Sequence, residues 1–249
     1  MQSRMAARKC SRKCSRASAI KCQGRSSKMT LPPRICDLPC IVVSPDEIWA
    51  ERGEAFIERF RPTGIRWKRF RGFMGLKLGL KAASRYLIDH PGAHDCPHCG
   101  RNMAYEIGPG VIGCSLSWQS AVRAAALLEL PSVLFVEDDT VPLPDLQERW
   151  TDMLHYLPPQ WQLINLGGDG HESGTAHRWN ERIIEGSVNQ NEAIIMNTEA
   201  MDAYIQDQQG WAPCDCYWVN YTNQRLNCFY PRPELFTQLS TKGGCRSTL

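Results

Sequence analysis

A run of apolar residues that ends in three consecutive acids is the most distinctive pattern along the chain. Residues 133–136 (Val-Leu-Phe-Val) lead directly into Glu137, Asp138 and Asp139. A continuous apolar run of this length, rich in β-branched and aromatic side chains, predicts a strand that is buried on both faces. If the backbone stays extended beyond the run, Glu137 and Asp139 project to one side and Asp138 to the other.

Apolar residues elsewhere recur with the periods of strands and helices. The first helix is expected to have Ser44 as its N-cap, Pro45 in its first position and Glu47 completing a capping box. Strands that alternate with helices favour an α/β fold in which helices flank a mostly parallel sheet. Strands are expected at residues 40–43, 65–70, 133–136, 162–166, 193–196 and 227–230, and helices at 45–60, 115–129, 145–156 and 198–206.

The length and composition fit a globular protein. The chain has 249 residues, of which 43% are hydrophobic and 22% are charged, and this length can bury one sizeable core or two small ones. No apolar run approaches the roughly 18–20 residues that cross a bilayer, so we expect no transmembrane segment.

The basic charge is concentrated at the N-terminus. Residues 1–30 contain nine Lys or Arg residues and no acid, whereas the remainder has 20 basic and 26 acidic residues and therefore a net charge of −6. An acidic body argues against binding of nucleic acid by the folded domain.

The basic segment has three interpretations. It is a disordered arm that contacts anionic surfaces, an organellar presequence, or a translated upstream stretch that precedes a start at Met29. It lacks the apolar core of a secretory signal, so we expect no export and a cytoplasmic location. We assign residues 1–35 to the arm or presequence and residues 36–249 to a single domain.

Three acids at the end of a strand repel one another unless their charge is compensated. Two like charges about 4 Å apart cost roughly 1 kcal/mol even in water. A divalent cation removes this cost, and clusters of carboxylate oxygens suit hard ions such as Mg²⁺ or Mn²⁺. The alternative is that the acids only end the strand and cap the turn that follows.

A second polar segment follows the strand expected at residues 162–166. Gly167, Gly168 and Asp169 stand at its carboxyl end, which is where ligands bind in doubly wound sheets. Glycine lets a backbone approach a ligand closely, so this segment suits contact with a sugar or nucleotide. The alternative is an ordinary Gly-rich turn from strand to loop.

Taken in order, several segments resemble the family 25 glycosyltransferases, which include lipooligosaccharide galactosyltransferases and the collagen galactosyltransferase domain. The resemblance covers residues 40–245 and is densest from 110 to 140. The family usually has Ser-His in the helix opening, where this chain has Ser117-Trp118. The segments that carry the resemblance are Gly113-Cys114-Ser115-Leu116-Ser117, residues 131–139 with the three acids, 161–167, 191–196, Pro213-Cys214-Asp215 and 238–240.

The resemblance implies a GT-A fold and inverting transfer of a sugar from a nucleotide sugar such as UDP-galactose to a glycan, lipid-linked or protein acceptor. It implies that Asp139 ligates Mn²⁺ or Mg²⁺. Glu137 is expected to hold the donor ribose or a water on the metal, and Asp138 to orient the loop. Further contacts with the donor are expected from Gly113, Ser117, Gly167, Gly168 and Asn191.

An inverting transfer also needs a general base that takes the proton of the acceptor hydroxyl. Asp215 is the first candidate, because the neighbouring Tyr217 and Trp218 suit packing against a sugar. The alternative is that Asp215 caps a helix that begins there. Asp169 is the second candidate for the base.

Twelve cysteines in a chain without a secretory signal favour metal binding or reduced thiols over a disulfide framework. Cys96 and Cys99 enclose Pro-His in the spacing of a zinc knuckle, inside an insertion near residues 90–105 that has no counterpart in the resemblance. A closed structural zinc site needs four ligands, and Cys36 and Cys40 are the nearest plausible partners. A redox pair and unpaired thiols are the alternatives.

The interpretation we favour is a metal-dependent glycosyltransferase, and two other functions stay open. Trp118 in place of the usual histidine leaves room for a non-catalytic domain of the same fold that binds glycan or protein. Cys96 and Cys99 leave room for a zinc-organised interaction module.

Overall fold

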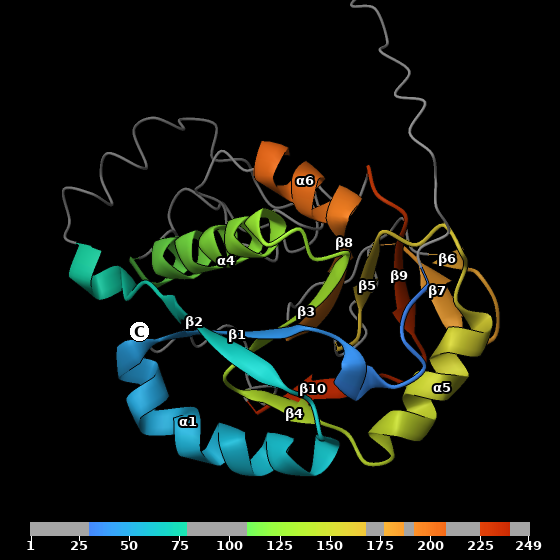
Figure 1. Cartoon of the computed structure of the whole chain (residues 1–249), viewed down its shortest axis with the longest axis horizontal. Helices are drawn as coiled ribbons and strands as arrows, with labels where there is room; N and C mark the ends of the chain where they lie inside the picture. Colours follow the sequence, from blue (N-terminus) through green and yellow to red (C-terminus); the bar gives the residue numbers. More distant parts are fainter. Residues whose placement is uncertain (1–29, 79–108, 168–176, 187–191, 208–224, 240–249) are drawn as a thin grey trace, which may run out of the picture.

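The computed structural model describes residues 30–78, 109–167, 177–186, 192–207 and 225–239, and expectations for other residues lie outside this part of the chain. Within it, a central sheet has eight strands in the order β2-β1-β3-β8-β5-β9-β7-β6 (Figure 1). The strands are β1 (Cys40–Pro45), β2 (Trp67–Gly72), β3 (Ser132–Glu137), β5 (Leu163–Asn165), β6 (His177–Arg178), β7 (Ile183–Glu185), β8 (Ala193–Asn197) and β9 (Cys228–Pro231).

Most strands of this sheet run in the same direction. β1 pairs in parallel with β2 and β3, and β5 pairs in parallel with β9. β8 is antiparallel to its neighbours β3 and β5, and β7 is antiparallel to β9 and β6. β8 and β7 are therefore the reversed strands of the described sheet. The expected α/β fold with a mostly parallel sheet is confirmed.

Helices cover both faces of the sheet (Figure 1). On one face, Trp118 of α4 packs with Phe135 of β3 in a cluster that also includes residues of α6. On the other, Phe56 of α1 and Trp150 of α5 join a cluster around Leu134. No helix of the described ranges is long and apolar enough to cross a membrane. The helices are α1 (Asp46–Phe60), α4 (Pro109–Leu127), α5 (Leu146–Tyr156) and α6 (Thr198–Asp207), with the short 3₁₀ helices η1 (Ile35–Asp37), η2 (Arg61–Thr63) and η3 (Gly75–Leu78).

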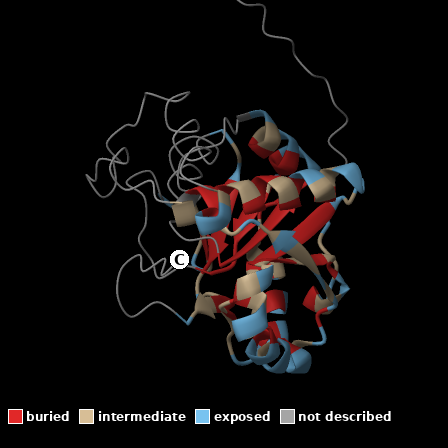
Figure 2. Cartoon of the chain, turned by 90° about the vertical axis from the view of Figure 1, so that its left-hand side faces the viewer, coloured by how far each residue is buried: buried red, intermediate tan, exposed pale blue. Residues whose placement is uncertain are grey.

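β3 lies in the middle of the core, as its apolar run predicts. Leu134 and Val136 belong to the cluster under α1 and α5, whereas Val133 and Phe135 belong to the cluster under α4 and α6. All four side chains are fully buried. Figure 2 shows the same arrangement, with buried strands between helices whose outer faces are exposed. A strand buried on both faces has no need of alternating polar residues, which explains the unbroken apolar run.

The core also includes residues that precede the first expected strand at Cys40. Ile35 in η1 and the neighbouring Leu38 are both almost fully buried in the cluster under α1 and α5. The indole Nε1 of Trp150 donates a hydrogen bond to the carbonyl oxygen of Pro32 at 3.1 Å. The stretch from residue 32 to 39 thus closes one end of the core.

The predicted capping box at the start of the first helix is wrong. β1 continues through Ser44 and Pro45, which stand opposite Arg71 and Gly72 of β2. The helix begins at Asp46 without a side-chain cap, and the Ser44 hydroxyl donates to the Pro45 carbonyl oxygen at 3.3 Å. Strand pairing therefore holds Ser44 in the sheet, where it cannot cap the helix.

The helix expected at residues 115–129 begins earlier, at Pro109, and takes in two glycines of low helix propensity. Gly113 explains why. A Cβ atom at Gly113 would lie 2.5 Å from the Gly75 nitrogen and 2.7 Å from the Phe73 carbonyl oxygen. Only glycine lets α4 approach the chain after β2 this closely, so tertiary packing extends the helix beyond the range that its composition predicts.

A small antiparallel sheet lies beside the main one and was not expected from the sequence. It pairs β4 (Thr140–Pro142) with β10 (Phe236–Gln238), and Gln238 stands opposite Thr140. Two residues, Asp138 and Asp139, separate the end of β3 from the start of β4. The pairing therefore brings the C-terminal part of the described chain next to the three acids.

The central position of β3 predicts a large difference between two leucine substitutions. Leu134 is fully buried, whereas Leu127 at the end of α4 is 84% exposed. We expect Leu134→Ala to lower the free energy of unfolding by about 2–5 kcal/mol and Leu127→Ala to change it by less than about 0.5 kcal/mol. Urea unfolding of both variants measures this, and equal effects would contradict the described core.

Candidate functional site

The three acids stand at the carboxyl edge of the sheet, where three neighbouring strands end together. In the register of the sheet, Glu137 of β3 stands opposite Val43 of β1, and Pro45 of β1 stands opposite Gly72 of β2. The carboxyl ends of parallel strands are where open α/β sheets bind ligands. The acids therefore lie at the edge of the sheet where folds of this class commonly bind ligands.

The chain turns sharply after Glu137, because hydrogen bonds fix the turn on both sides. The Glu137 amide donates to the Thr140 hydroxyl oxygen at 3.1 Å and to the Glu192 carbonyl oxygen at 3.2 Å. The Thr140 hydroxyl donates in turn to the Glu192 carbonyl at 2.6 Å. Asp138 and Asp139 occupy the turn, so the backbone beyond Glu137 is not extended as the strand pattern suggested.

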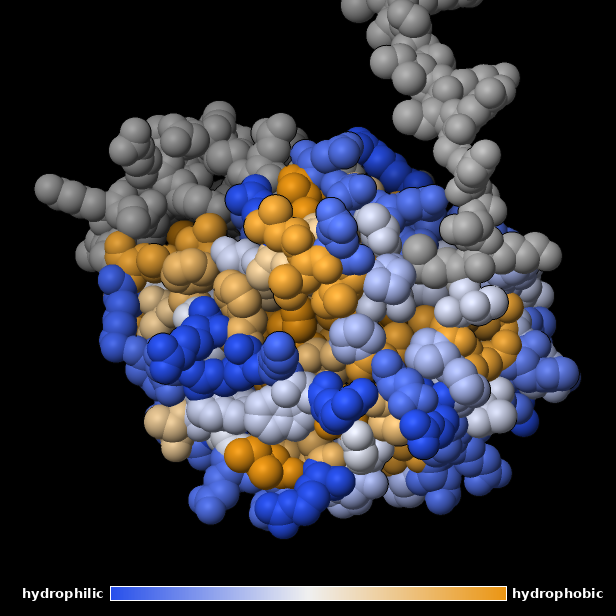
Figure 3. Space-filling view, in the orientation of Figure 1, coloured by the Kyte–Doolittle hydropathy of each residue, from blue (hydrophilic) through white to orange (hydrophobic). Residues whose placement is uncertain are grey.

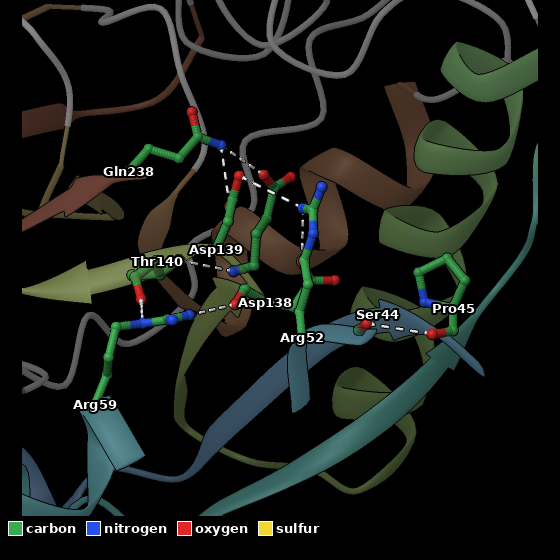
Figure 4. A network of polar contacts seen from close by, with 9 residues as sticks. Ser44, Pro45, Arg52, Arg59, Asp138, Asp139, Thr140 and Gln238 are labelled. Atoms are coloured by element: carbon green, nitrogen blue, oxygen red, sulfur yellow. Dashed lines mark hydrogen bonds and ion pairs between the residues drawn. The ribbon is translucent and has the colours of Figure 1, made fainter. Parts of the chain in front are cut away.

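Glu137 and Asp139 nevertheless lie on the same side, because one amide group bridges them. The Gln238 Nε2 atom donates to Glu137 Oε2 and to Asp139 Oδ1, at 3.2 Å each. Figure 4 shows Gln238 reaching Asp139 from one side while Arg52 approaches it from the other. The pairing of β10 with β4 positions this amide, which is about a hundred residues away from the acids in sequence.

Trp118 holds the second oxygen of Glu137. Its indole Nε1 donates to Glu137 Oε1 at 2.9 Å, and its ring is fully buried against Phe135 with centroids 6.0 Å apart. A hydrogen bond to a carboxylate is stronger than one between neutral groups. Trp118 and Gln238 together therefore fix the orientation of the Glu137 carboxylate.

Two arginines of α1 hold the middle acid and the turn around it. Arg52 Nη1 lies 3.2 Å from Asp138 Oδ1 and 4.0 Å from Asp139 Oδ2. Arg59 donates to the Asp138 carbonyl oxygen at 2.7 Å and to the Thr140 carbonyl oxygen at 3.3 Å (Figure 4). These contacts with Arg52 and Arg59 hold Asp138 and the turn around it in one orientation.

The electrostatics of the site disfavour a negative charge on Asp139. Burial, and then the charge of Asp138, raise the pKa of Asp139 above its ordinary value, while the Gln238 amide and Arg52 act in the opposite direction. The raised pKa means that the donors around Asp139 do not fully replace the water it loses. A positive charge placed beside Asp139 would stabilise its ionised form.

These side chains fit a hard divalent cation. In the described ranges no group of three or more His, Cys, Asp or Glu side chains could hold a metal ion. Asp139 and Glu137, which Gln238 bridges, are the two acids that would hold one here. Mg²⁺ and Mn²⁺ suit such a pair, because they commonly bind one or two carboxylates and complete their shell with water and substrate phosphates. The predicted metal site stays a prediction, and its donor set is chemically suitable.

Gly113 and Ser117, which were expected to contact a donor, lie in a packed interface instead. The Ser117 hydroxyl accepts a hydrogen bond from the Phe73 amide at 2.7 Å and donates to the Gly113 carbonyl oxygen at 2.6 Å. It is almost fully buried, and a Cβ atom at Gly72 would lie 2.7 Å from it. Both residues dock α4 against the end of β2, and their effect on a ligand in this arrangement is indirect.

Gly167 follows β5 and packs against Glu192, a fully buried residue that sequence reasoning did not single out. A Cβ atom at Gly167 would lie 3.1 Å from Glu192 Oε2, so the position favours glycine. Glu192 immediately precedes the apolar run of β8, which is the same pattern of an acid beside a buried strand that marked Glu137. The other candidates, Gly168, Asp169, Asn191 and Asp215, lie outside the described residues.

A cleft of about 210 Å³ opens at the ends of β1 and β2. It is lined by residues 46–47 and 72–74 together with Lys77 and Leu78. Lys77 pairs with Glu47, and Arg71 lies 3.3 Å from Asp46, so its rim carries both signs of charge. Sequence reasoning missed this cleft, although Pro45 after a buried strand and the glycines at 72 and 75 are signals of it.

The described cysteines lie in the hydrophobic core or pack against it. Cys40 lies in the cluster under α1 and α5, and burial raises its pKa strongly, as it does for Cys228. A raised pKa disfavours the thiolate that zinc requires. Cys96 and Cys99 lie outside the described residues, so the structural zinc stays a prediction.

No family model and no curated protein matches this chain. Among solved structures, the chain is similar to A197 from STIV, with 12% identity, a TM-score of 0.37, and coverage of 78% of this chain and 80% of that one. It is also similar to a glycosyltransferase involved in the glycosylation of the major capsid of PBCV-1, with 10% identity, a TM-score of 0.43, and coverage of 83% of this chain and 94% of that one. These likenesses are too distant to carry an argument about function.

The amide bridge predicts a change in the acidity of Asp139. Gln238→Leu removes the donor that favours the ionised carboxylate, so the pKa of Asp139 should rise further above its ordinary value. A ¹³C NMR titration of the side-chain carboxyl groups, in buffer free of divalent metal, measures the shift. Gln160→Leu, at an exposed position, is the control and should leave that pKa unchanged. An unaltered or lower pKa in Gln238→Leu would contradict the bridge.

The raised pKa of Asp139 also predicts a gain in stability when its charge is removed. The folded state binds a proton at Asp139 more tightly than the unfolded chain does. The stability from this difference is complete below the ordinary pKa of 3.8 and is lost as the pH rises through the raised value. In metal-free buffer, Asp139→Asn should therefore raise the urea midpoint at neutral pH, and the gain should vanish below about pH 3.8.

The matched control for this substitution is Asp145→Asn. Asp145 is exposed and has a φ of 59°, a conformation that asparagine also adopts readily. Its midpoint should follow that of the unaltered protein at every pH. A loss of stability in Asp139→Asn at neutral pH would show that the charge is compensated better than the geometry indicates.

Proposed function

We propose that the protein is a metal-dependent glycosyltransferase, which moves a sugar from a nucleotide-diphosphate donor to a hydroxyl acceptor. The observation that carries the proposal is the carboxylate pair of Glu137 and Asp139 at the carboxyl end of β3, held toward one side by Gln238. The pair stands at the same edge of the sheet as the cleft at the ends of β1 and β2. A charged diphosphate between a cleft and a cation site is the ligand that suits this layout.

Each acid has a distinct role in this proposal. When bound, a divalent cation supplies Lewis-acid stabilisation of the charge that develops on the departing diphosphate. Asp139 is the acid that would hold it, because its buried carboxylate gains most from a neighbouring positive charge. Glu137 is oriented by Trp118 and Gln238 and would hold the donor ribose or a water in the metal's shell.

Arg52 adds positive charge to the same place. Its side chain is 42% exposed and lies within 4.0 Å of Asp139, so it remains accessible to a ligand while it balances the acids. In a partly dry site, a fixed guanidinium group stabilises phosphate oxygens by charge and by hydrogen bonds. Arg52 would therefore help to bind the diphosphate of the donor.

The cleft would hold the nucleoside end of the donor. Its volume of about 210 Å³ is smaller than the roughly 300–1,000 Å³ of typical small-molecule sites, so it fits a part of the donor. UDP-galactose is the donor that we would test first, by resemblance to the family 25 enzymes.

The general base of the proposed inverting transfer is Asp215, with Asp169 as the second candidate. Both lie outside the described residues, so their assignment depends on the sequence alone. A glycan, lipid-linked or protein hydroxyl would be the acceptor.

The alternative of a non-catalytic domain depended on Trp118 in place of histidine. The indole N–H of Trp118 donates to Glu137, which is a contact that a histidine ring N–H can also make. The substitution therefore retains a donor at this position, and it no longer favours the non-catalytic alternative. The zinc-organised module depends on Cys96 and Cys99 and is tested by metal content with and without Cys96→Ser.

The proposal predicts release of nucleoside diphosphate from a sugar nucleotide in the presence of Mn²⁺. A panel of nucleotide sugars, assayed with Mn²⁺, Mg²⁺ and EDTA, should reveal one donor that is turned over only with metal. Asp139→Asn should lower this rate by roughly a hundredfold or more, because a lost metal ligand removes several kcal/mol of stabilisation from the transition state.

The control again is Asp145→Asn, which should retain full activity. Thermal unfolding of both variants establishes that the fold is intact. Full metal-stimulated turnover in Asp139→Asn, or no turnover of any donor by the unaltered protein together with no binding of Mn²⁺ and UDP by calorimetry, would rule out the proposal.

A further inference from the structure

Basic and apolar side chains are exposed together along the edge strand β2 and the short helix η3 that follows it. Residues 64–78 contain five Lys or Arg residues and no acid, although the chain beyond residue 30 is acidic overall. We call the exposed members of this segment the β2–η3 surface. They are Arg66, Lys68, Arg71, Phe73, Leu76 and Lys77.

The apolar members of this surface protrude rather than pack. Phe73 is 42% exposed and Leu76 is 60% exposed, although Ile65 near the start of the same segment is buried in the core. Figure 3 shows apolar side chains in the region of η3 beside a band of hydrophilic ones along β2. Phe73 and Leu76 lie three residues apart in sequence. Exposed aromatic and leucine side chains are groups that insert at the boundary between lipid headgroups and acyl chains.

The basic members give the surface a net positive charge. Arg71 and Lys77 keep 77% and 69% of their side chains exposed while they pair with Asp46 and Glu47. Asp37 is a third acid near the strand, where it pairs with Arg34 at 2.8 Å and lies within the electrostatic influence of Arg66. The four basic residues of the surface and the less exposed Arg69 of the same segment, set against these three acids, leave an excess of two positive charges beside Phe73 and Leu76.

A second exposed apolar pair shows what distinguishes this surface. Leu127 and Leu128, at the end of α4, are 84% and 67% exposed, which is more than Phe73 or Leu76. Glu129 follows them directly, and the nearest basic residue in sequence is Arg123. Leu127 and Leu128 thus expose apolar surface without a basic residue next to them in sequence, whereas the β2–η3 surface exposes apolar and basic side chains together.

We propose that the β2–η3 surface docks the protein on a membrane that contains anionic lipids. Lys and Arg attract the negative headgroups, at about 1 kcal/mol per residue close to the surface, while Phe73 and Leu76 insert below them. A membrane fits better than a nucleic acid, because insertion uses the protruding apolar groups that a phosphate backbone would leave exposed. Phe73 and Lys77 also line the cleft, so docking places the mouth of the cleft at the membrane.

The test is co-sedimentation of the full chain with lipid vesicles. The protein should sediment with vesicles of phosphatidylcholine mixed with phosphatidylglycerol, much less with phosphatidylcholine alone, and less as the salt concentration rises. Phe73→Ser combined with Leu76→Ser should lower the partition coefficient about tenfold or more, because two apolar side chains no longer leave water. Lys68→Gln should lower it roughly fivefold.

Leu127→Ser combined with Leu128→Ser is the matched control and should leave partitioning unchanged. The basic residues 1–30 are present in every variant, so any affinity that they add is common to all of them. Equal partitioning of the two double variants, equal binding to neutral vesicles, or binding to RNA without binding to vesicles would overturn the proposal. The outcome is independent of sugar transfer, since no donor or metal enters the assay.

Discussion

The structure around the candidate site depends on keeping two carboxylates together at the dry end of a buried strand. Glu137 and Asp139 repel each other, and their position at the edge of the core removes much of the water that would screen them. Donors from three other elements compensate for this: the indole of Trp118 in α4, the arginines of α1, and the amide of Gln238 in β10. The small sheet of β4 and β10 places the Gln238 amide beside the two acids.

The donors around Asp139 compensate only in part for the burial of its charge. Asp139 keeps a raised pKa despite the nearby amide and guanidinium groups, so the folded protein carries an energetic cost at this residue. If Asp139 had only a structural role, a second close donor or a neutral residue at this position would make the fold more stable. Perturbed pKa values cluster at functional sites, so the surroundings of Asp139 support the proposed ligand site.

The packing of α4 connects the site to the rest of the molecule. Gly113 and Ser117 bring the helix against the end of β2 and fix the backbone of Phe73, which lines the cleft. Trp118, the next residue after Ser117 in the same helix, orients Glu137. The segment that carries the sequence resemblance thus supports both ends of the proposed donor site through packing and hydrogen bonds, because Gly113 has no side chain and the Ser117 hydroxyl is held in the interface between α4 and the end of β2.

The sequence by itself determined the central strand, the helices that cover it and the place of the acids. The unbroken apolar run of residues 133–136 identifies a central strand directly, because a strand that is buried on both faces requires apolar side chains at every position. Only the tertiary structure decided which way the strands run at β8, that Ser44 stays in the sheet, that α4 begins at Pro109, and that Gln238 bridges two acids a hundred residues earlier. These features arise from contacts between segments far apart in the chain, whose energies a local pattern of polar and apolar residues does not contain.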